Sequence, residues 1–208
     1  MIPYDVAVTF FIASVILALV PGPDNIFVLT QSALHGKKAG LAVVFGLCTG
    51  LIFHSLAVAL GVAVIFKTSL LAFTLLKMAG AAYLIYLAWI SFRASASKLE
   101  SKEVKELSLG KLYCRGVIMN ITNPKVSIFF LAFLPQFTDP ERGSVAVQVF
   151  MLGGLFIIST IWVFGGVALL AGSLGQWLNR SDKAQLVLNK IAGVVFVGLA
   201  VKLAMSHQ

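Results

Sequence analysis

The sequence predicts an all-α integral membrane protein whose six transmembrane helices form a 3+3 inverted repeat. Three observations predict it: the composition, the number of long apolar runs, and a pair of proline-containing interruptions at corresponding places in the two halves. Of the 208 residues, 59% are hydrophobic and only 12% are charged, and the mean hydropathy is +0.97. Average soluble domains carry about 25% charged residues, so the composition excludes a soluble enzyme and a nucleic-acid-binding domain.

Six apolar runs approach or exceed the roughly 20 residues that a helix needs to cross a bilayer. They are Val6–Leu34, Leu41–Phe66, Leu70–Phe92, Val117–Phe137, Val145–Leu174 and Ile191–Met205. We therefore expect one transmembrane domain over residues 1–208. Repeat one takes residues 1–93, a hydrophilic cytoplasmic linker takes 94–111, and repeat two takes 112–208.

Lysine and arginine are unevenly distributed among the loops. The first, third and fifth loops hold two, six and three of them, whereas the even loops and the C-terminal end together hold three. By the positive-inside rule, the odd loops lie in the cytoplasm and both termini lie on the outer side. The two cysteines, Cys48 and Cys114, have no metal-ligand spacing and are not expected to form a disulfide. No metal or cofactor is expected.

The first and fourth runs are each interrupted by a proline motif. A continuous helix over Val6–Leu34 would be about 44 Å long, against about 30 Å of hydrocarbon. Prolines at Pro21 and Pro23 disfavour a continuous helix there, and Pro124 does so in the fourth run. Broken helices persist in membranes only where they face protein or a watery cavity.

The interruptions occupy corresponding places in the two halves, and a second pair of segments also matches. Lys77–Leu84 opens the third run and resembles Lys190–Val197, which opens the sixth. Each repeat crosses the membrane three times and therefore ends on the side opposite to its start. The second repeat consequently enters the membrane from the opposite side. Inverted repeats are the usual plan of secondary transporters, and paired Pro/Gly interruptions point to their binding site.

Aligning Pro23 with Pro124 places Asp24 opposite Lys125, and these are the two charges deepest in the membrane. Each costs at least about 2.5–3.5 kcal/mol at the bilayer centre, so each needs a partner or a use. One reading is an ion pair that clamps the repeats together. The other is a site in which Asp24 binds an ammonium, while Lys125 and two half-helix N-termini hold a carboxylate. A small zwitterion fits both.

The candidate substrate-binding and coupling residues lie at or beside the two breaks, apart from a histidine in the second run. They are Asp24, Lys125, Pro21, Gly22, Pro23, Asn25, Asn120, Asn123, Pro124 and His54. The asparagines can satisfy backbone groups that the breaks free. His54 reads either as a proton relay or as a residue bonded to a neighbouring helix. The Gly46-x-x-x-Gly50 motif permits close helix approach, within the bundle or in a homodimer.

With these motifs in this order, the whole chain resembles the LysE/RhtB family of bacterial amino-acid exporters. The motifs that carry the resemblance are Pro21–Asn25, Asn120–Lys125 and Lys77–Leu84. The resemblance implies export of a neutral or basic amino acid, or a close derivative, across the bacterial inner membrane. It also implies protons as the coupling ion.

Alternatives on the same inverted-repeat plan are a small inorganic-ion exporter, a passive channel, and a scaffold whose Asp24–Lys125 pair is structural. An ion exporter is expected to gather several carboxylates, and the apolar runs offer only Asp24. An enzyme is not expected, because no nucleophile–base pair or metal cluster appears among the runs.

Overall fold

The computed structural model describes residues 2–68, 70–95, 107–180 and 182–205, and these residues form helices and no strand. The α-helices are α1 (Tyr4–Leu19), α2 (Pro23–His35), α3 (Lys37–Thr68), α4 (Leu70–Arg93), α5 (Leu109–Thr122), α6 (Pro124–Ile128), α7 (Val145–Arg180) and α8 (Asp182–Met205). Three short helices join α6 to α7: the π-helix η1 (Phe129–Phe133) and the 3-10 helices η2 (Leu134–Phe137) and η3 (Pro140–Arg142).

Each of the six predicted runs coincides with a helix or with a broken helix. Among the described residues, three helices are long and apolar enough to cross a membrane, or up to five segments if each bent pair is one span. The all-helical architecture is thus confirmed and is consistent with a membrane protein, and the six-span 3+3 repeat stays a prediction. Most of the predicted cytoplasmic linker, residues 96–106, lies outside the described residues.

Both predicted breaks are present at the proline motifs. The axis turns by 62° between α1 and α2, and by 51° between α5 and the segment Pro124–Phe137. Pro23 and Pro124 each occupy the first position of the new helix, where the missing amide hydrogen costs no hydrogen bond. Each of these prolines therefore starts the second half-helix of its run.

The second half of the fourth run departs from a regular half-helix. After only five α-helical residues, the chain continues as η1 and then as η2. Pro135, which lies in the first turn of η2, lacks an amide hydrogen and cannot bond to the carbonyl four residues back. A regular α-helix therefore cannot run through this position.

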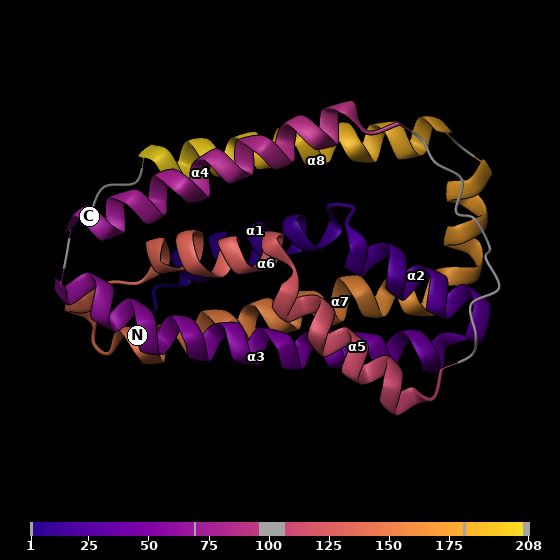
Figure 1. The fold of residues 1–208 in the computed structure, drawn as a ribbon, viewed down its shortest axis with the longest axis horizontal. Helices are drawn as coiled ribbons and strands as arrows, with labels where there is room; N and C mark the ends of the chain where they lie inside the picture. The colour runs from indigo at the N-terminus through magenta and orange to yellow at the C-terminus, as the bar shows by residue number, and fades with distance from the viewer. Residues whose placement is uncertain (1, 69, 96–106, 181, 206–208) are drawn as a thin grey trace.

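Helices that are far apart in the sequence pack together in pairs. Helix α3 packs on α5 and α7, α1 and α2 pack on α7, and α4 packs on α8. Figure 1 shows α4 and α8 side by side along one edge of the molecule. If the first three runs are exchanged with the last three, the contact between the first and fifth runs becomes a contact between the fourth and second runs. Both contacts are present. This correspondence supports the predicted repeat.

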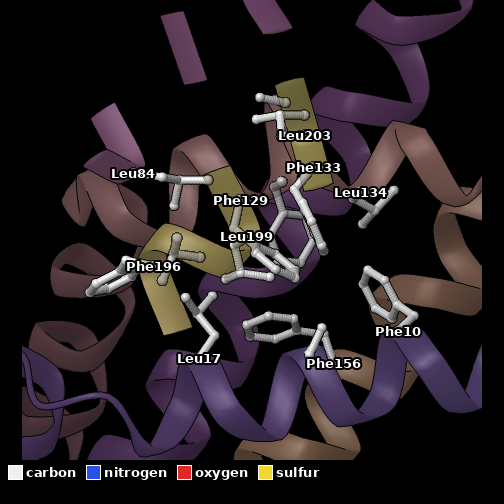
Figure 2. Packing of buried hydrophobic residues seen from close by; sticks show 14 of the residues in the cluster. Phe10, Leu17, Leu84, Phe129, Phe133, Leu134, Phe156, Phe196, Leu199 and Leu203 are labelled. Atoms are coloured by element: carbon white, nitrogen blue, oxygen red, sulfur yellow. The ribbon is translucent and has the colours of Figure 1, made fainter. Parts of the chain in front are cut away.

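Phenylalanines fill the core on one side of the breaks. Phe10, Phe129, Phe130, Phe133 and Phe156, which we call the phenylalanine cluster, are at most 3% exposed. Ring centroids lie 4.8 Å apart for Phe129 and Phe133, and 5.3 Å apart for Phe129 and Phe156. Figure 2 shows four of these rings packed between α1, η1 and α7. The cluster joins the N-terminal half of α1 to the second half of the fourth run.

Glycines bring α3 and α5 into backbone contact. A Cβ atom on Gly46 would collide with the carbonyl oxygen of Tyr113, and one on Gly116 would collide with that of Val43. Gly50 faces the Asn120 side chain in the same way. The Gly46-x-x-x-Gly50 motif therefore packs within the bundle, which is one of the two arrangements that the sequence allowed.

Replacing Gly116 by alanine is expected to destabilise the protein by about 1–3 kcal/mol, because the new methyl group must push α5 away from α3. Thermal unfolding of the detergent-solubilised protein measures this. Gly154→Ala on α7 is the matched control, since nothing lies within 4 Å of a Cβ atom there. Equal melting temperatures for the two variants would contradict the close contact.

Candidate substrate site at the two helix breaks

The two breaks meet inside the protein and bring the predicted charges together. Asp24 is the second residue of α2 and Lys125 is the second residue of α6. Their exposed fractions are 3% and 8%. A carboxylate beside a helix N-terminus is stabilised by the helix dipole, so the position of Asp24 in the first turn of α2 offsets part of its burial cost.

Asn123 links the two half-helices. Its side-chain nitrogen donates to Oδ2 of Asp24 at 2.7 Å, and its side-chain oxygen accepts from the backbone amide of Lys125 at 3.0 Å. One asparagine thus caps α6 and holds the carboxylate of α2. Because Asn123 and Asp24 lie in different halves of the chain, this hydrogen bond joins the two breaks directly.

The carbonyl groups freed at the end of α1 are satisfied by side chains. The Lys125 ammonium donates to the carbonyl oxygens of Leu17 and Val20 at 3.3 and 3.1 Å, and the Asn25 amide donates to that of Ala18 at 2.8 Å. These groups have no water to bond in a bilayer. The ammonium also lies at the negative end of the α1 dipole, which stabilises it.

Among the described residues, no ion pair joins Asp24 to Lys125, since their charged groups take the separate partners given above. In this conformation the Lys125 ammonium is bonded to the end of α1, and its role in holding a substrate carboxylate stays a prediction. The break leaves carbonyls at the end of α1 without helical partners, and two of them lie within hydrogen-bond distance of the Lys125 ammonium. Sequence alignment of the breaks does not reveal that geometry.

The remaining predicted residues surround this arrangement. Gly22 leaves room for Lys125, whose Nζ would be 3.2 Å from a Cβ atom at that position. His54 on α3 lies 3.1 Å from the backbone oxygen of Asn120, measured from Nε2. This histidine is therefore hydrogen-bonded to a neighbouring helix, as its second interpretation expected. Its ring also contacts the ring of Phe130. Pro21 and Pro23 line the larger of the two cavities that border the breaks.

That larger cavity, of about 630 Å³, lies between α2 and α5. Besides the Pro21–Pro23 turn, it is lined by Phe27, Gln31 and Arg115, and the Arg115 guanidinium lies 4.8 Å from the Phe27 ring centroid. Both helices run from this cavity toward the loops that the charge distribution places in the cytoplasm. Arg115 and Gln31 were not predicted, because neither stands beside a break in the sequence.

A second, much smaller cavity of about 10 Å³ lies on the other side of the turn. Asp24, Asn120, Lys125 and Thr160 contribute its polar lining. Thr160 was also missed by the sequence analysis. It is a single threonine in the apolar run of α7, and only the fold brings it opposite the breaks.

Comparison with known proteins gives one family model and several relatives along almost the whole chain. The LysE type translocator model matches residues 15–207. The homoserine/homoserine lactone efflux protein of Salmonella typhimurium is 36% identical over 199 residues, 96% of both chains. An uncharacterized membrane protein of Vibrio cholerae is 33% identical over 195 residues, 94% of both chains. No solved structure matches.

Replacing Asn123 by alanine is expected to destabilise the protein by about 1–3 kcal/mol, because it leaves Oδ2 of the buried Asp24 without its donor and removes the cap of α6. Thermal unfolding in detergent measures the loss. Thr122→Val is the adjacent control, since the Thr122 hydroxyl is exposed and bonds only within its own helix. A melting temperature for Asn123→Ala as high as that of the control would contradict the bridging role.

Proposed function

Because this multi-pass membrane chain belongs to the LysE type translocator family, we propose that it exports a small amino acid or a close derivative by secondary-active transport. The observation that carries the proposal is the buried Asp24 carboxylate at the junction of two half-helices. An ionisable side chain at such a place in a membrane protein marks a transport pathway by default. We place the protein in the bacterial inner membrane, with both termini outside.

The substrate class that we propose is homoserine and its lactone, or compounds of similar size. A relative of 36% identity is named an efflux protein for both. Homoserine is a zwitterion, whereas the lactone has its carboxyl group closed into an ester and carries no carboxylate. The α-amino group is therefore the charged group that the two compounds share. Asp24 is the buried carboxylate available to it, while the Lys125 ammonium is occupied by α1.

The arrangement of cavities supports export from the cytoplasm. The 630 Å³ cavity lies on the predicted cytoplasmic side of the Pro21–Pro23 turn, and the phenylalanine cluster fills the opposite side. Substrate would load from the cytoplasm through this cavity. Rocking of one repeat against the other would then part the phenylalanine cluster and close the cavity, which is alternating access.

Asp24 also supplies a simple coupling scheme. A carboxylate that binds a proton is neutral and no longer attracts an ammonium, whereas an ionised carboxylate binds the ammonium well. Proton and substrate therefore exclude each other at the same side chain. If the transporter changes between its two open states only when Asp24 holds either a proton or the substrate, each substrate that moves outward is exchanged for a proton that moves inward.

Everted membrane vesicles, in which an exporter loads the lumen, test the function. We expect accumulation of labelled homoserine by vesicles containing the protein, abolished by a protonophore. Asp24→Asn removes the charge at nearly constant volume and is expected to reduce accumulation to the background of protein-free vesicles. Asp5→Asn, a control at an exposed carboxylate near the start of α1, is expected to transport at the wild-type rate.

Counter-flow separates a carrier from a channel. Vesicles preloaded with unlabelled homoserine should take up the labelled compound faster, because only a carrier is accelerated by substrate on the far side. Wild-type transport by Asp24→Asn at the same protein level would refute the proposed role of the carboxylate. Absence of accumulation of any amino acid by the wild type would refute the function itself.

A further inference from the structure

Three residues that line the smaller cavity each carry a buried oxygen atom with no hydrogen-bond partner in the described part of the chain. These atoms are Oδ1 of Asp24 on α2, Oδ1 of Asn120 on α5 and Oγ1 of Thr160 on α7. The exposed fractions of these residues are 3%, 3% and 2%. Buried polar atoms are nearly always paired, so each such atom calls for an explanation. Three unpaired oxygen atoms on residues around one cavity call for a single explanation.

Thr160 is unusual among the buried hydroxyl groups of the residues that the structure describes. The hydroxyls of Ser14, Ser32 and Ser55 each donate to the carbonyl four residues back in their own helix. Ser159, the immediate neighbour of Thr160, donates to the carbonyl of Phe156 at 2.8 Å. Such bonds are the usual way for a hydroxyl to be satisfied in an apolar helix. Thr160, which lines the same small cavity as Asp24, departs from this pattern.

We propose that Asp24, Asn120 and Thr160 form the subsite for the primary ammonium group of the exported molecule. This inference rests on the proposed function. A primary alkylammonium has three N–H donors, and the cavity supplies three acceptors from three different helices. One acceptor is a carboxylate, which makes its hydrogen bond to the cation stronger than a neutral one. The apolar wall formed by Leu17, Phe156 and Phe164 keeps water from competing for these acceptors.

The subsite predicts which molecules are recognised. The cavity, about 10 Å³, has room for a group the size of one water molecule, which suits an –NH₃⁺ head and excludes a trimethylammonium. The rest of the substrate must extend out of the subsite when the transporter opens. Homoserine and its lactone present the same head, whereas 2,4-dihydroxybutyrate, with a hydroxyl in place of the amine, does not.

The test replaces Thr160 by valine, which keeps the side-chain shape and removes the hydroxyl. In everted vesicles, we expect the KM for homoserine to rise about tenfold or more, as for the loss of a hydrogen bond to a charged group. The KM for the lactone should rise by the same factor, because the lost contact is to the amino group. Thr160→Ser retains the hydroxyl, so its KM should stay within about twofold of the wild-type KM. Such a change is much smaller than the tenfold change that corresponds to about 1.4 kcal/mol.

A stability measurement separates this role from a structural one. Removing an unpaired buried hydroxyl is neutral or stabilising, so Thr160→Val should melt at or above the wild-type temperature while transporting poorly. Ser159→Ala, the control at the paired neighbouring hydroxyl, should keep the wild-type KM. Protection of the purified wild type against heat by methylammonium chloride, weaker in Thr160→Val and absent with tetramethylammonium chloride, would support the subsite directly.

The outcomes distinguish this inference from the function on which it rests. If the wild type transports homoserine and Thr160→Val has the same KM, the subsite is wrong and the export function stands. A KM that rises for homoserine but not for the lactone would also overturn it, because Thr160 would then contact the carboxylate end. Protection by sodium chloride equal to that by methylammonium chloride would replace the ammonium subsite with a metal-cation site. Failure of the wild type to export any amino compound removes both proposals.

Discussion

The arrangement at the centre of this protein depends on one constraint: a backbone carbonyl freed inside a bilayer has no water to bond. At the end of α1, three carbonyl oxygens are satisfied by the Lys125 ammonium and the Asn25 amide. Because Lys125 belongs to the other half of the chain, satisfying this break holds the two halves together. Asn123, which also belongs to the second half, joins the two breaks a second time by donating to Asp24. The breaks therefore stabilise each other.

This mutual dependence gives the two central charges different roles. Lys125 is taken up by the protein's own backbone, whereas Asp24 keeps one oxygen without a partner in the described residues. The carboxylate is consequently the member of the pair that remains free to meet a ligand. A transporter built in this way recognises its substrate by a positive group, and the proposed coupling follows from the same side chain. The phenylalanine cluster packs on one side of the breaks, and the 630 Å³ cavity lies between α2 and α5.

Much of the architecture could be predicted because its causes are local. Proline at Pro23 and Pro124 must interrupt or start a helix wherever it stands, and both breaks occur there. The composition predicted a multi-pass membrane protein, and the motif residues predicted the translocator family that the comparisons confirm. The irregular η1 and η2 helices were not foreseen, since a run of phenylalanines carries no signal for a π-helix.

The sequence by itself determined which residues lie at the breaks and that Asp24 and Lys125 are buried in an apolar environment. These follow from hydropathy and backbone chemistry, which act over a few residues. Only the tertiary structure decided that Asn123 bridges the halves, that Lys125 turns to the end of α1, and that Thr160 lines the same small cavity as Asp24. Those contacts depend on how helices far apart in the sequence cross one another. The periodicity of a single helix does not indicate which other helices pack against it.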